Sequence, residues 1–369
     1  MSSNTEVILF GLGAVGSRLL KALENDHCFI SIVGAVDTDP KKHNKKIGEL
    51  LPDISRFKNV HIFSSLDECL LNLGKTPDVM LHMTESKPAI IEKQLSTALQ
   101  KGINVLSASE AMFYPNLRHP NFSSRLNEKA LESNVTITGF GINPGFSFDS
   151  LPLLLARTTS NITSLIINRT IDVTGTGQGD IEHVGYGLTE KEFNYHLNKG
   201  DIVGHMGAPD SLTLIAEYLN LRLTHIQEFW ETKTASFEVD SGDPSLGILS
   251  PGRVVGITQK AEAYCNNNCI IKTTLKMFYQ PKVFGLEEQD EIIIEGEMPI
   301  NLKIKPALQS LNGAANIIAS SIIDVKNSKP GLVNYLDLPL GAHKRSKIKY
   351  KIDDSQQQKT GYTPICIDE

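Results

Sequence analysis

Val7-Ile8-Leu9-Phe10-Gly11-Leu12-Gly13-Ala14-Val15-Gly16, residues 7–16, decides the fold class of this chain. An apolar run leads directly into a Gly-x-Gly-x-x-Gly pattern, and residues 17–20 continue at helical spacing. A strand, a tight turn and a helix start in this order are the context in which the pattern binds a dinucleotide, although glycine-rich strand–helix turns also occur without nucleotides. Gly11 permits the turn, Gly13 lets a pyrophosphate approach, and Gly16 lets the helix pack on the strand. Amides at the helix start face the phosphates. The predicted phosphate-binding residues are Gly11, Leu12, Gly13, Ala14, Val15 and Gly16.

Asp37 supplies a second nucleotide signal. Residues 30–36 have the character of the next strand, and Asp37 ends it, 21 residues after Gly16. A carboxylate at this place accepts the ribose hydroxyls of an adenosine and repels a 2′-phosphate, which favours NAD. A basic run follows, and it either attracts that phosphate or is a solvated face; it comprises Lys41, Lys42, His43, Lys45 and Lys46. We therefore expect an NAD(P)H cofactor, with NAD accepted and NADP tolerated.

Composition is that of a soluble protein with room for two domains. The chain has 369 residues, of which 40% are hydrophobic and 21% charged. Its net charge of −6 argues against a nucleic-acid partner. The first residues lack the features of a signal peptide, and the apolar runs are too short to span a bilayer, so we expect no membrane partner and a cytoplasmic location.

The cysteines and histidines indicate neither disulfides nor a metal. The 5 cysteines are odd in number and scattered, which is not a disulfide framework. No His or Cys cluster has the spacing of a zinc site. We expect no metal.

The pattern of elements changes near residue 146. Residues 1–145 alternate between strands and helices, which predicts a Rossmann domain with a doubly wound parallel sheet that binds a dinucleotide. Residues 146–305 contain long strands rich in Ile, Val, Thr and aromatics, which predicts an α+β domain with a mainly antiparallel sheet, for substrate binding and dimerisation. Residues 306–369 are expected to form a helix that packs back on the first domain, followed by a polar tail.

Ligands of a parallel sheet bind at the carboxyl ends of its strands. Thr84 and Ser107 follow two predicted strands and are therefore expected at the cofactor. Glu110 follows the same strand as Ser107. A carboxylate in a partly dry pocket beside the nicotinamide exchanges protons near neutral pH or stabilises a cationic iminium. The alternative from the residues alone is a solvent-facing carboxylate at a helix start.

A turn-rich segment, residues 139–146, follows the last predicted strand of the first domain. Asn143 and Pro144 begin a rigid turn whose backbone is expected to contact the nicotinamide carboxamide. Phe140 and Phe146 offer apolar walls to a substrate. A role as an interdomain hinge is compatible with both functions.

These motifs together resemble the 2,4-diaminopentanoate dehydrogenases and the related native NAD(P)H-dependent amine dehydrogenases. The glycine triplet is unspecific, but the Asn-Pro-Gly block with its upstream glutamate is more specific, and the resemblance covers nearly the whole chain. The matching segments are Gly11-x-Gly13-x-x-Gly16, Ser109-Glu110-Ala111-Met112-Phe113-Tyr114-Pro115, Gly141-Ile142-Asn143-Pro144-Gly145-Phe146, Gly204-His205-Met206-Gly207, Pro251-Gly252-Arg253 and Pro330-Gly331-Leu332.

The resemblance implies a fold like that of dihydrodipicolinate reductase, without the His-His and Lys signature of that enzyme. It implies that Glu110 is catalytic and activates ammonia as it adds to a carbonyl, and that Phe146 shapes the pocket. Asp172, His183 and His205 are candidates for the pocket wall in the second domain, with Asp172 available to a second amino group.

The expected function is that of an NAD(P)H-dependent amine dehydrogenase, which reductively aminates a small ketone or aldehyde and deaminates a primary amine in reverse. The close alternative is a 2,4-diaminopentanoate dehydrogenase proper. Two more distant alternatives are a non-catalytic NAD(P)-binding sensor and an oxidoreductase of alcohols or 2-hydroxy acids. The nearby candidate for the acid of the latter is His82, which lies inside an apolar strand and is therefore interpreted as a core or supporting residue. We expect a homodimer, since long strands of the second domain can pair across a two-fold axis.

Overall fold

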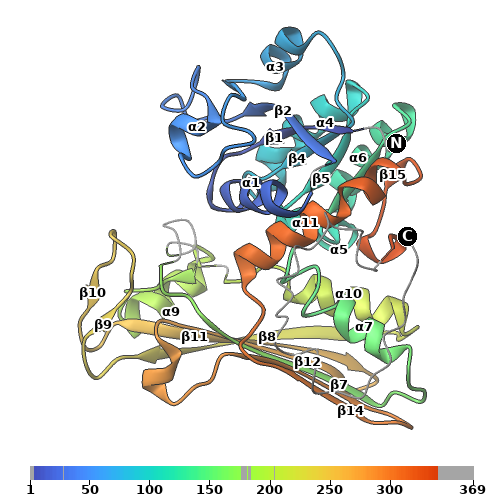
Figure 1. The fold of residues 1–369 in the computed structure, drawn as a ribbon. Coiled ribbons are helices and arrows are strands. Elements are labelled where there is room, and N and C mark those ends of the chain that lie inside the picture. Colours follow the sequence, from blue (N-terminus) through green and yellow to red (C-terminus); the bar gives the residue numbers. More distant parts are fainter. Residues whose placement is uncertain (1–3, 28, 176–180, 182–183, 203, 340–369) are drawn as a thin grey trace, which may run out of the picture.

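The computed structural model describes residues 4–27, 29–175, 181, 184–202 and 204–339, and Figure 1 shows an α/β layer above an open sheet. In the first domain seven strands form one sheet in the order β15-β6-β5-β4-β1-β2-β3, and every neighbouring pair is parallel. This confirms the expected doubly wound sheet. Its strands are β1 (Thr5–Phe10), β2 (Ile30–Val36), β3 (Ile62–Phe63), β4 (Val79–His82), β5 (Asn104–Ser107), β6 (Thr136–Gly139) and β15 (Gly331–Leu332).

Helices cover both faces of this sheet, as a parallel sheet requires. They are α1 (Ala14–Asp26), α2 (Ile47–Leu50), α3 (Leu66–Leu73), α4 (Pro88–Gln100), α5 (Pro115–Arg118) and α6 (Pro120–Glu132). The strands between them are buried on both faces, and Val79–His82 has no exposed residue.

The glycine loop between β1 and α1 has the geometry that its sequence predicts. Gly11 has φ +105°, and a Cβ there would lie 2.3 Å from the Met83 carbonyl oxygen. A Cβ at Gly16 would lie 2.0 Å from the Gly11 carbonyl oxygen. Only glycine therefore fits the turn and the close approach of helix to strand.

The second domain is a six-stranded sheet in the order β14-β13-β7-β12-β11-β8. β7 and β12 pair in parallel and the other neighbours antiparallel, so the sheet is mixed and mainly antiparallel, as expected. Its strands are β7 (Ser164–Asp172), β8 (His225–Thr234), β11 (Val254–Cys265), β12 (Asn268–Phe278), β13 (Gln289–Glu295) and β14 (Ile300–Ile304). β9 (Val239–Asp240) and β10 (Ile248–Leu249) form a separate ribbon.

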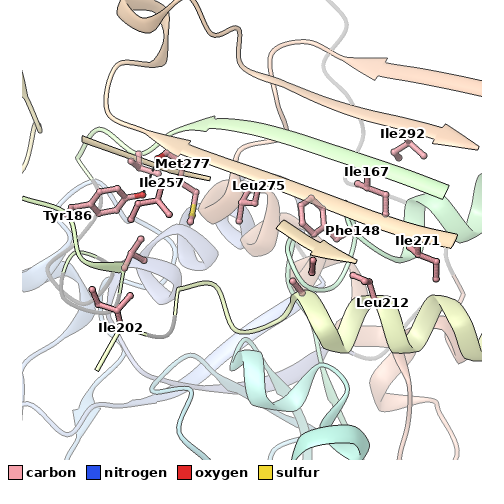
Figure 2. Close-up of a cluster of buried hydrophobic side chains, with 14 of the residues drawn as sticks. Phe148, Ile167, Tyr186, Ile202, Leu212, Ile257, Ile271, Leu275, Met277 and Ile292 are labelled. Atoms are coloured by element: carbon pink, nitrogen blue, oxygen red, sulfur yellow. Dashed lines mark hydrogen bonds between the residues drawn. The ribbon is translucent and has the colours of Figure 1, made fainter. Parts of the chain in front are cut away.

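One face of the second sheet carries helices and the apolar core. The helices are α7 (Ser150–Ala156), α9 (Glu190–Lys199) and α10 (Ala208–Tyr218). Figure 2 shows Leu212 of α10 beneath Ile271 of β12, with Phe148 and, from β7, Ile167 nearby. Alternate residues face away from the helices, which gives the strands a period of two between apolar and polar positions.

The C-terminal segment returns to the first domain. α11 (Ser310–Lys326) buries Ala315, Ile318 and Ile322 in the core that also holds Leu19 of α1. β15 then adds to β6, parallel to it. The tail that was expected from residue 344 onward lies outside the described residues. Within the described part of the chain, no helix is both long and apolar enough to cross a membrane.

Candidate active site

The predicted cofactor residues converge because the parallel strands end in register. Phe10 pairs with Val36 and with His82, His82 pairs with Ser107, and Ser107 pairs with Gly139. The segments that follow these residues therefore leave the sheet side by side at one edge. This edge is where ligands bind in open α/β sheets.

The start of α1 fits the phosphates of a dinucleotide. Gly13 and Ala14 are exposed there, and a Cβ at Gly13 would meet no heavy atom within 4 Å. Among the described residues no side chain caps the first turn of α1, so its amides are available to an anion. Gly11, Leu12 and Gly16 are buried and shape the loop.

Asp37 lies at the end of β2, as predicted, but its carboxylate already has three protein donors. Oδ1 accepts the Asp39 N–H at 2.9 Å, and Oδ2 accepts the Leu12 N–H at 2.8 Å and the Lys42 ammonium at 2.9 Å. Burial raises the pKa of Asp37, but these hydrogen bonds outweigh it and hold the pKa below its ordinary value.

Thr84 and Ser107 both contact His82. The His82 ring lies 2.9 Å from Ser107 Oγ through Nδ1 and 2.8 Å from Thr84 Oγ1 through Nε2. Burial lowers the pKa of His82 to about 4, against a weaker opposite effect of Gln94. His82 is therefore neutral near pH 7 and is held by Ser107, Thr84 and Gln94, which does not suit the acid that the hydroxy-acid alternative requires.

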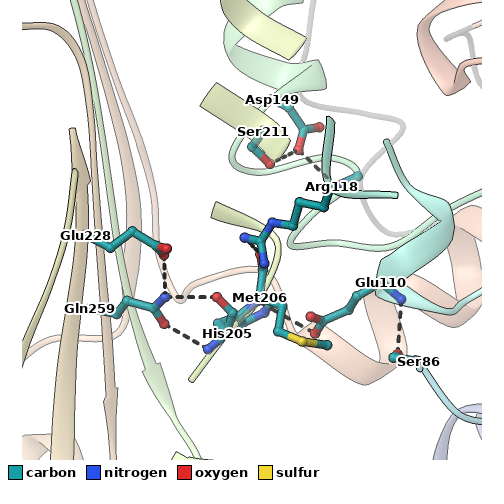
Figure 3. Close-up of polar contacts among 10 residues, drawn as sticks. Ser86, Glu110, Arg118, Asp149, His205, Met206, Ser211, Glu228 and Gln259 are labelled. Atoms are coloured by element: carbon teal, nitrogen blue, oxygen red, sulfur yellow. Dashed lines mark hydrogen bonds and ion pairs between the residues drawn. The ribbon is translucent and has the colours of Figure 1, made fainter. Parts of the chain in front are cut away.

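Glu110 opens the 3-10 helix η1 (Glu110–Met112) and points toward the second domain. Its N–H donates to Ser86 Oγ at 3.1 Å, and its Oε1 lies 3.6 Å from His205 Nδ1 (Figure 3). The Glu110 side chain is 32% exposed and that of His205 20%. The carboxylate is thus at a helix start, but it faces a histidine rather than open solvent.

The second-domain sheet fixes the position of His205. Gln259 of β11 accepts the His205 N–H at 2.8 Å and donates to the His205 carbonyl at 2.9 Å. The same amide donates to Glu228 Oε1 at 3.1 Å. Two hydrogen bonds to one peptide segment restrict its rotation, so His205 is oriented by β11 and β8.

A charged cluster surrounds this pair (Figure 3). Arg118 of α5 donates to the Met206 carbonyl, and its Nε lies 3.4 Å from Asp210 Oδ1 of α10. Burial raises the pKa of Asp210 to about 7, while Arg118 lowers it and the charges of Glu110 and Glu228 raise it. Burial also raises the pKa of Glu228, against a hydrogen bond from Gln259. Arg118 therefore acts on both Asp210 and Glu228, and Glu110 adds a third carboxyl group near Asp210.

A pocket of about 490 Å³ adjoins the cluster, lined among others by Arg118, Met206, Glu228 and Trp230. Glu228 and Trp230 are two residues apart on β8, so their side chains lie on the same face of the strand. A second hollow of about 520 Å³ is lined by Thr258 and Lys260, among other residues. These two residues flank Gln259 on β11 and therefore lie on the opposite face of the strand. None of the residues of the charged cluster lines this second hollow. We therefore place the candidate site at the pocket beside Arg118 and Glu228.

The 139–146 turn meets the same region. A Cβ at Gly207, just after His205, would lie 2.3 Å from Pro144 Cδ. Asp149 accepts the Gly145 N–H at 2.9 Å and the Ser211 hydroxyl at 2.7 Å, which ties the turn to α10. Asn143 Oδ1 is buried and has no hydrogen-bond partner among the described residues, so its capacity to accept a hydrogen bond is unused.

Two predicted pocket residues, Phe140 and Asp172, have other surroundings. Phe140 is 2% exposed and packs edge-on against Tyr335, so it belongs to the core of the first domain rather than to a pocket wall. Asp172, at the exposed end of β7, accepts N–H groups of Thr174 and Gln280 and holds a turn there. His183 lies outside the described residues. Phe146 is half-buried within the turn.

Sequence reasoning did not single out Arg118, Asp210, Glu228 or Gln259. The period of two along residues 225–234 was a signal that Glu228 and Trp230 share one face of a strand. Gln259 lies opposite Trp230 because of the register between β11 and β8, and the register of two segments that are distant in the chain cannot be read from local sequence.

Family models match both halves of the chain. The model described as 2,4-diaminopentanoate dehydrogenase C-terminal domain matches residues 146–354, and the one described as homoserine dehydrogenase, NAD binding domain, matches residues 11–138. A curated 2,4-diaminopentanoate dehydrogenase of Acetoanaerobium sticklandii is 28% identical over 340 residues, which cover 91% of this chain and 93% of the relative.

Solved structures share the fold. An amine dehydrogenase from Mycobacterium smegmatis superposes with a TM-score of 0.79 at 23% identity, covering 92% of this chain and 97% of the other. A scyllo-inositol dehydrogenase from Lactobacillus casei with bound NAD(H) and scyllo-inositol gives a TM-score of 0.56 at 11% identity, covering 90% and 93%. At these identities the likeness concerns the fold alone.

Proposed function

The chain belongs to the 2,4-diaminopentanoate dehydrogenase C-terminal domain family, and on that premise we propose that it joins ammonia to a small ketone or aldehyde by reductive amination. The enzyme is an NAD(P)-dependent oxidoreductase that acts on amines, and in reverse it deaminates a primary amine. The observation that carries the reaction is Glu110, a half-exposed carboxylate 3.6 Å from His205 at the carboxyl edge of the sheet. The first test is NAD(P)H consumption, which should require both a carbonyl compound and ammonia.

Glu110 has the proton-transfer roles. It accepts a proton from ammonium, and the ammonia so formed attacks the carbonyl carbon to give a carbinolamine. The protonated Glu110 then returns its proton to the departing hydroxyl, which leaves as water. The carboxylate that remains stabilises the iminium cation electrostatically. The start of α1 and the Asn143–Pro144 turn would hold the nicotinamide cofactor, which when bound would provide hydride for the iminium carbon.

His205 is proposed to orient Glu110, because in the described part of the chain its ring is the ion-pairing group that lies within 3.6 Å of that carboxylate. We expect His205→Ala to lower kcat by about 10-fold and to change the pH profile of kcat, since misplacing a reacting group is costly. The Kd of the cofactor should stay within about twofold. Steady-state kinetics against pH and a fluorescence titration measure both.

A matched control is His196→Ala. His196 is on α9 and pairs with Asp201, and its side chain neither lines the pocket nor contacts Glu110 among the described residues. An equal loss in the two variants, or an unchanged pH profile in His205→Ala, would contradict the orienting role.

A second candidate, 2,4-diaminopentanoate dehydrogenase proper, is favoured by the pocket beside the cluster. Glu228 supplies a carboxylate there and Trp230 an aromatic face, and both attract an ammonium group. The excess of carboxyl groups over Arg118 adds to that attraction. This pocket, rather than Asp172, is where we propose that a second amino group binds.

Glu228→Gln tests this candidate, because glutamine still accepts the hydrogen bond from Gln259. We expect the KM for 2,4-diaminopentanoate to rise about 10–100-fold, as for the loss of a charge-assisted hydrogen bond. The KM for a simple monoamine should be unchanged. A similar rise in KM for both substrates would contradict the proposal that a second amino group binds in this pocket. The homodimer and the cytoplasmic location stay predictions from the sequence.

A further inference from the structure

The Asp37 carboxylate is not free to hold a ribose diol. An ionised carboxylate oxygen accepts about two hydrogen bonds. Oδ2 already accepts two, from the Leu12 N–H and from Lys42, and Oδ1 accepts one from Asp39. To bind both hydroxyls of a ribose, each carboxylate oxygen of Asp37 must have room to accept one more hydrogen bond. Lys42 must therefore leave Asp37 before Asp37 can bind NAD(H) in this way.

The Lys42 ammonium lies between the glycine loop and the end of β2. It is 2.9 Å from Asp37 Oδ2 and 3.3 Å from the Leu12 carbonyl oxygen. The Lys42 side chain is 24% exposed, against 9% for Asp37. The lysine can therefore turn toward a ligand, whereas the more buried carboxylate stays in place. His43 anchors the segment, because its Nε2 lies 2.8 Å from the Asp37 carbonyl oxygen.

Two other lysines of the basic run are more exposed than Lys42. Lys41 and Lys45 are exposed. Within the described part of the chain, Lys42 is the lysine recorded in an ion pair with Asp37. Lys42 is thus distinguished from its neighbours by position rather than by charge.

We infer that Lys42 selects the 2′-phosphorylated cofactor: its ammonium turns from Asp37 to the 2′-phosphate of NADP(H), so that the chain binds NADP(H) at least as tightly as NAD(H). A phosphate is the stronger partner for an ammonium. Asp37 keeps the Asp39 and Leu12 N–H donors, which stabilise its charge near the phosphate. The inference goes beyond the proposed function, since the amination runs with either cofactor.

The test is a set of binding titrations that need no turnover. The Kd values of NADPH, NADH, adenosine 2′,5′-bisphosphate and adenosine 5′-monophosphate are measured by calorimetry for the wild type and for Lys42→Ala. In Lys42→Ala we expect the Kd of both 2′-phosphorylated ligands to rise about 10–100-fold. The Kd of NADH should stay within about twofold or fall, because Asp37 is released.

Two further variants make the test specific. Lys45→Ala removes the same charge from an exposed neighbour and should leave all four Kd values within about twofold, as expected of a solvated charge. Lys42→Arg keeps the charge and should retain most of the NADPH affinity. If Lys42→Ala does not fold by circular dichroism, Lys42→Gln removes the charge in its place, with the same expected rise in the Kd of NADPH.

Four results would overturn the inference. The first three are an unchanged NADPH Kd in Lys42→Ala, an equal loss for NADPH and NADH, and a loss in Lys45→Ala as large as that in Lys42→Ala. Wild-type protein that binds NADH much more tightly than NADPH would also overturn it. An absence of amine chemistry would refute the proposed function and leave these titrations valid.

Discussion

Glu110→Gln is expected to lower kcat by about 10²–10⁴-fold, the usual contribution of a positioned general acid–base. Glutamine has the size of glutamate, and it keeps the N–H of residue 110 on Ser86 Oγ. It neither accepts the proton of ammonium nor neutralises an iminium. The loss should therefore appear in kcat, while the Kd of NAD(P)H stays within about twofold.

Steady-state kinetics in both directions, with a fluorescence titration of the cofactor, measure these quantities. Glu85→Gln is the matched control, because Glu85 is an exposed carboxylate next to Ser86. Activity within about twofold of the wild type is expected for that variant, as for a surface charge. If Glu110→Gln kept its full kcat, the non-catalytic sensor or a different acid–base group would account for the site better.

Asp290→Ala is expected to lower the free energy of unfolding by about 3–5 kcal/mol, because it leaves a buried charge without its partner. The Arg169–Asp290 pair joins β7 to β13, with side-chain exposures of 0% and 4%. Arg169 also donates to the Leu308 carbonyl and to Ser310 Oγ, and Asp290 accepts the Leu308 N–H. The pair thus anchors the segment that enters α11.

Urea unfolding followed by circular dichroism measures this effect. The double variant Arg169→Met, Asp290→Leu removes both charges and should be less destabilised than Asp290→Ala alone. Glu231→Ala breaks an exposed pair with Lys260 and should cost at most about 1 kcal/mol. A double variant less stable than Asp290→Ala would show that the buried charge is not the cause.

The fold was predictable because its signals are local. The glycine loop needs only the strand, turn and helix start around Gly11, and the alternation of elements indicates the parallel sheet. Family membership confirms the expected class of enzyme. Glu110 was located correctly at a strand end, since parallel strands end at a common edge.

The surroundings of these residues were not predictable, because they depend on contacts between distant segments. Phe140 was expected to line the pocket, but Tyr335 from the C-terminal segment covers it. Asp37 was expected to be open to a ribose, but the direction of the Lys42 side chain determines its availability. Gln259 reaches His205 through the register of β11 with its neighbours, which one sequence does not specify.

Reductive amination with isotopically labelled ammonium tests the central claim most directly. Purified protein is mixed with NAD(P)H, labelled ammonium and a panel of small ketones and aldehydes, and the products are identified by mass spectrometry. We expect a primary amine that carries the label, in amounts equal to the NAD(P)H consumed, for the wild type and not for Glu110→Gln. An alcohol as the product, or no consumption of NADPH and NADH with any carbonyl compound or with 2,4-diaminopentanoate in reverse, would contradict the central claim.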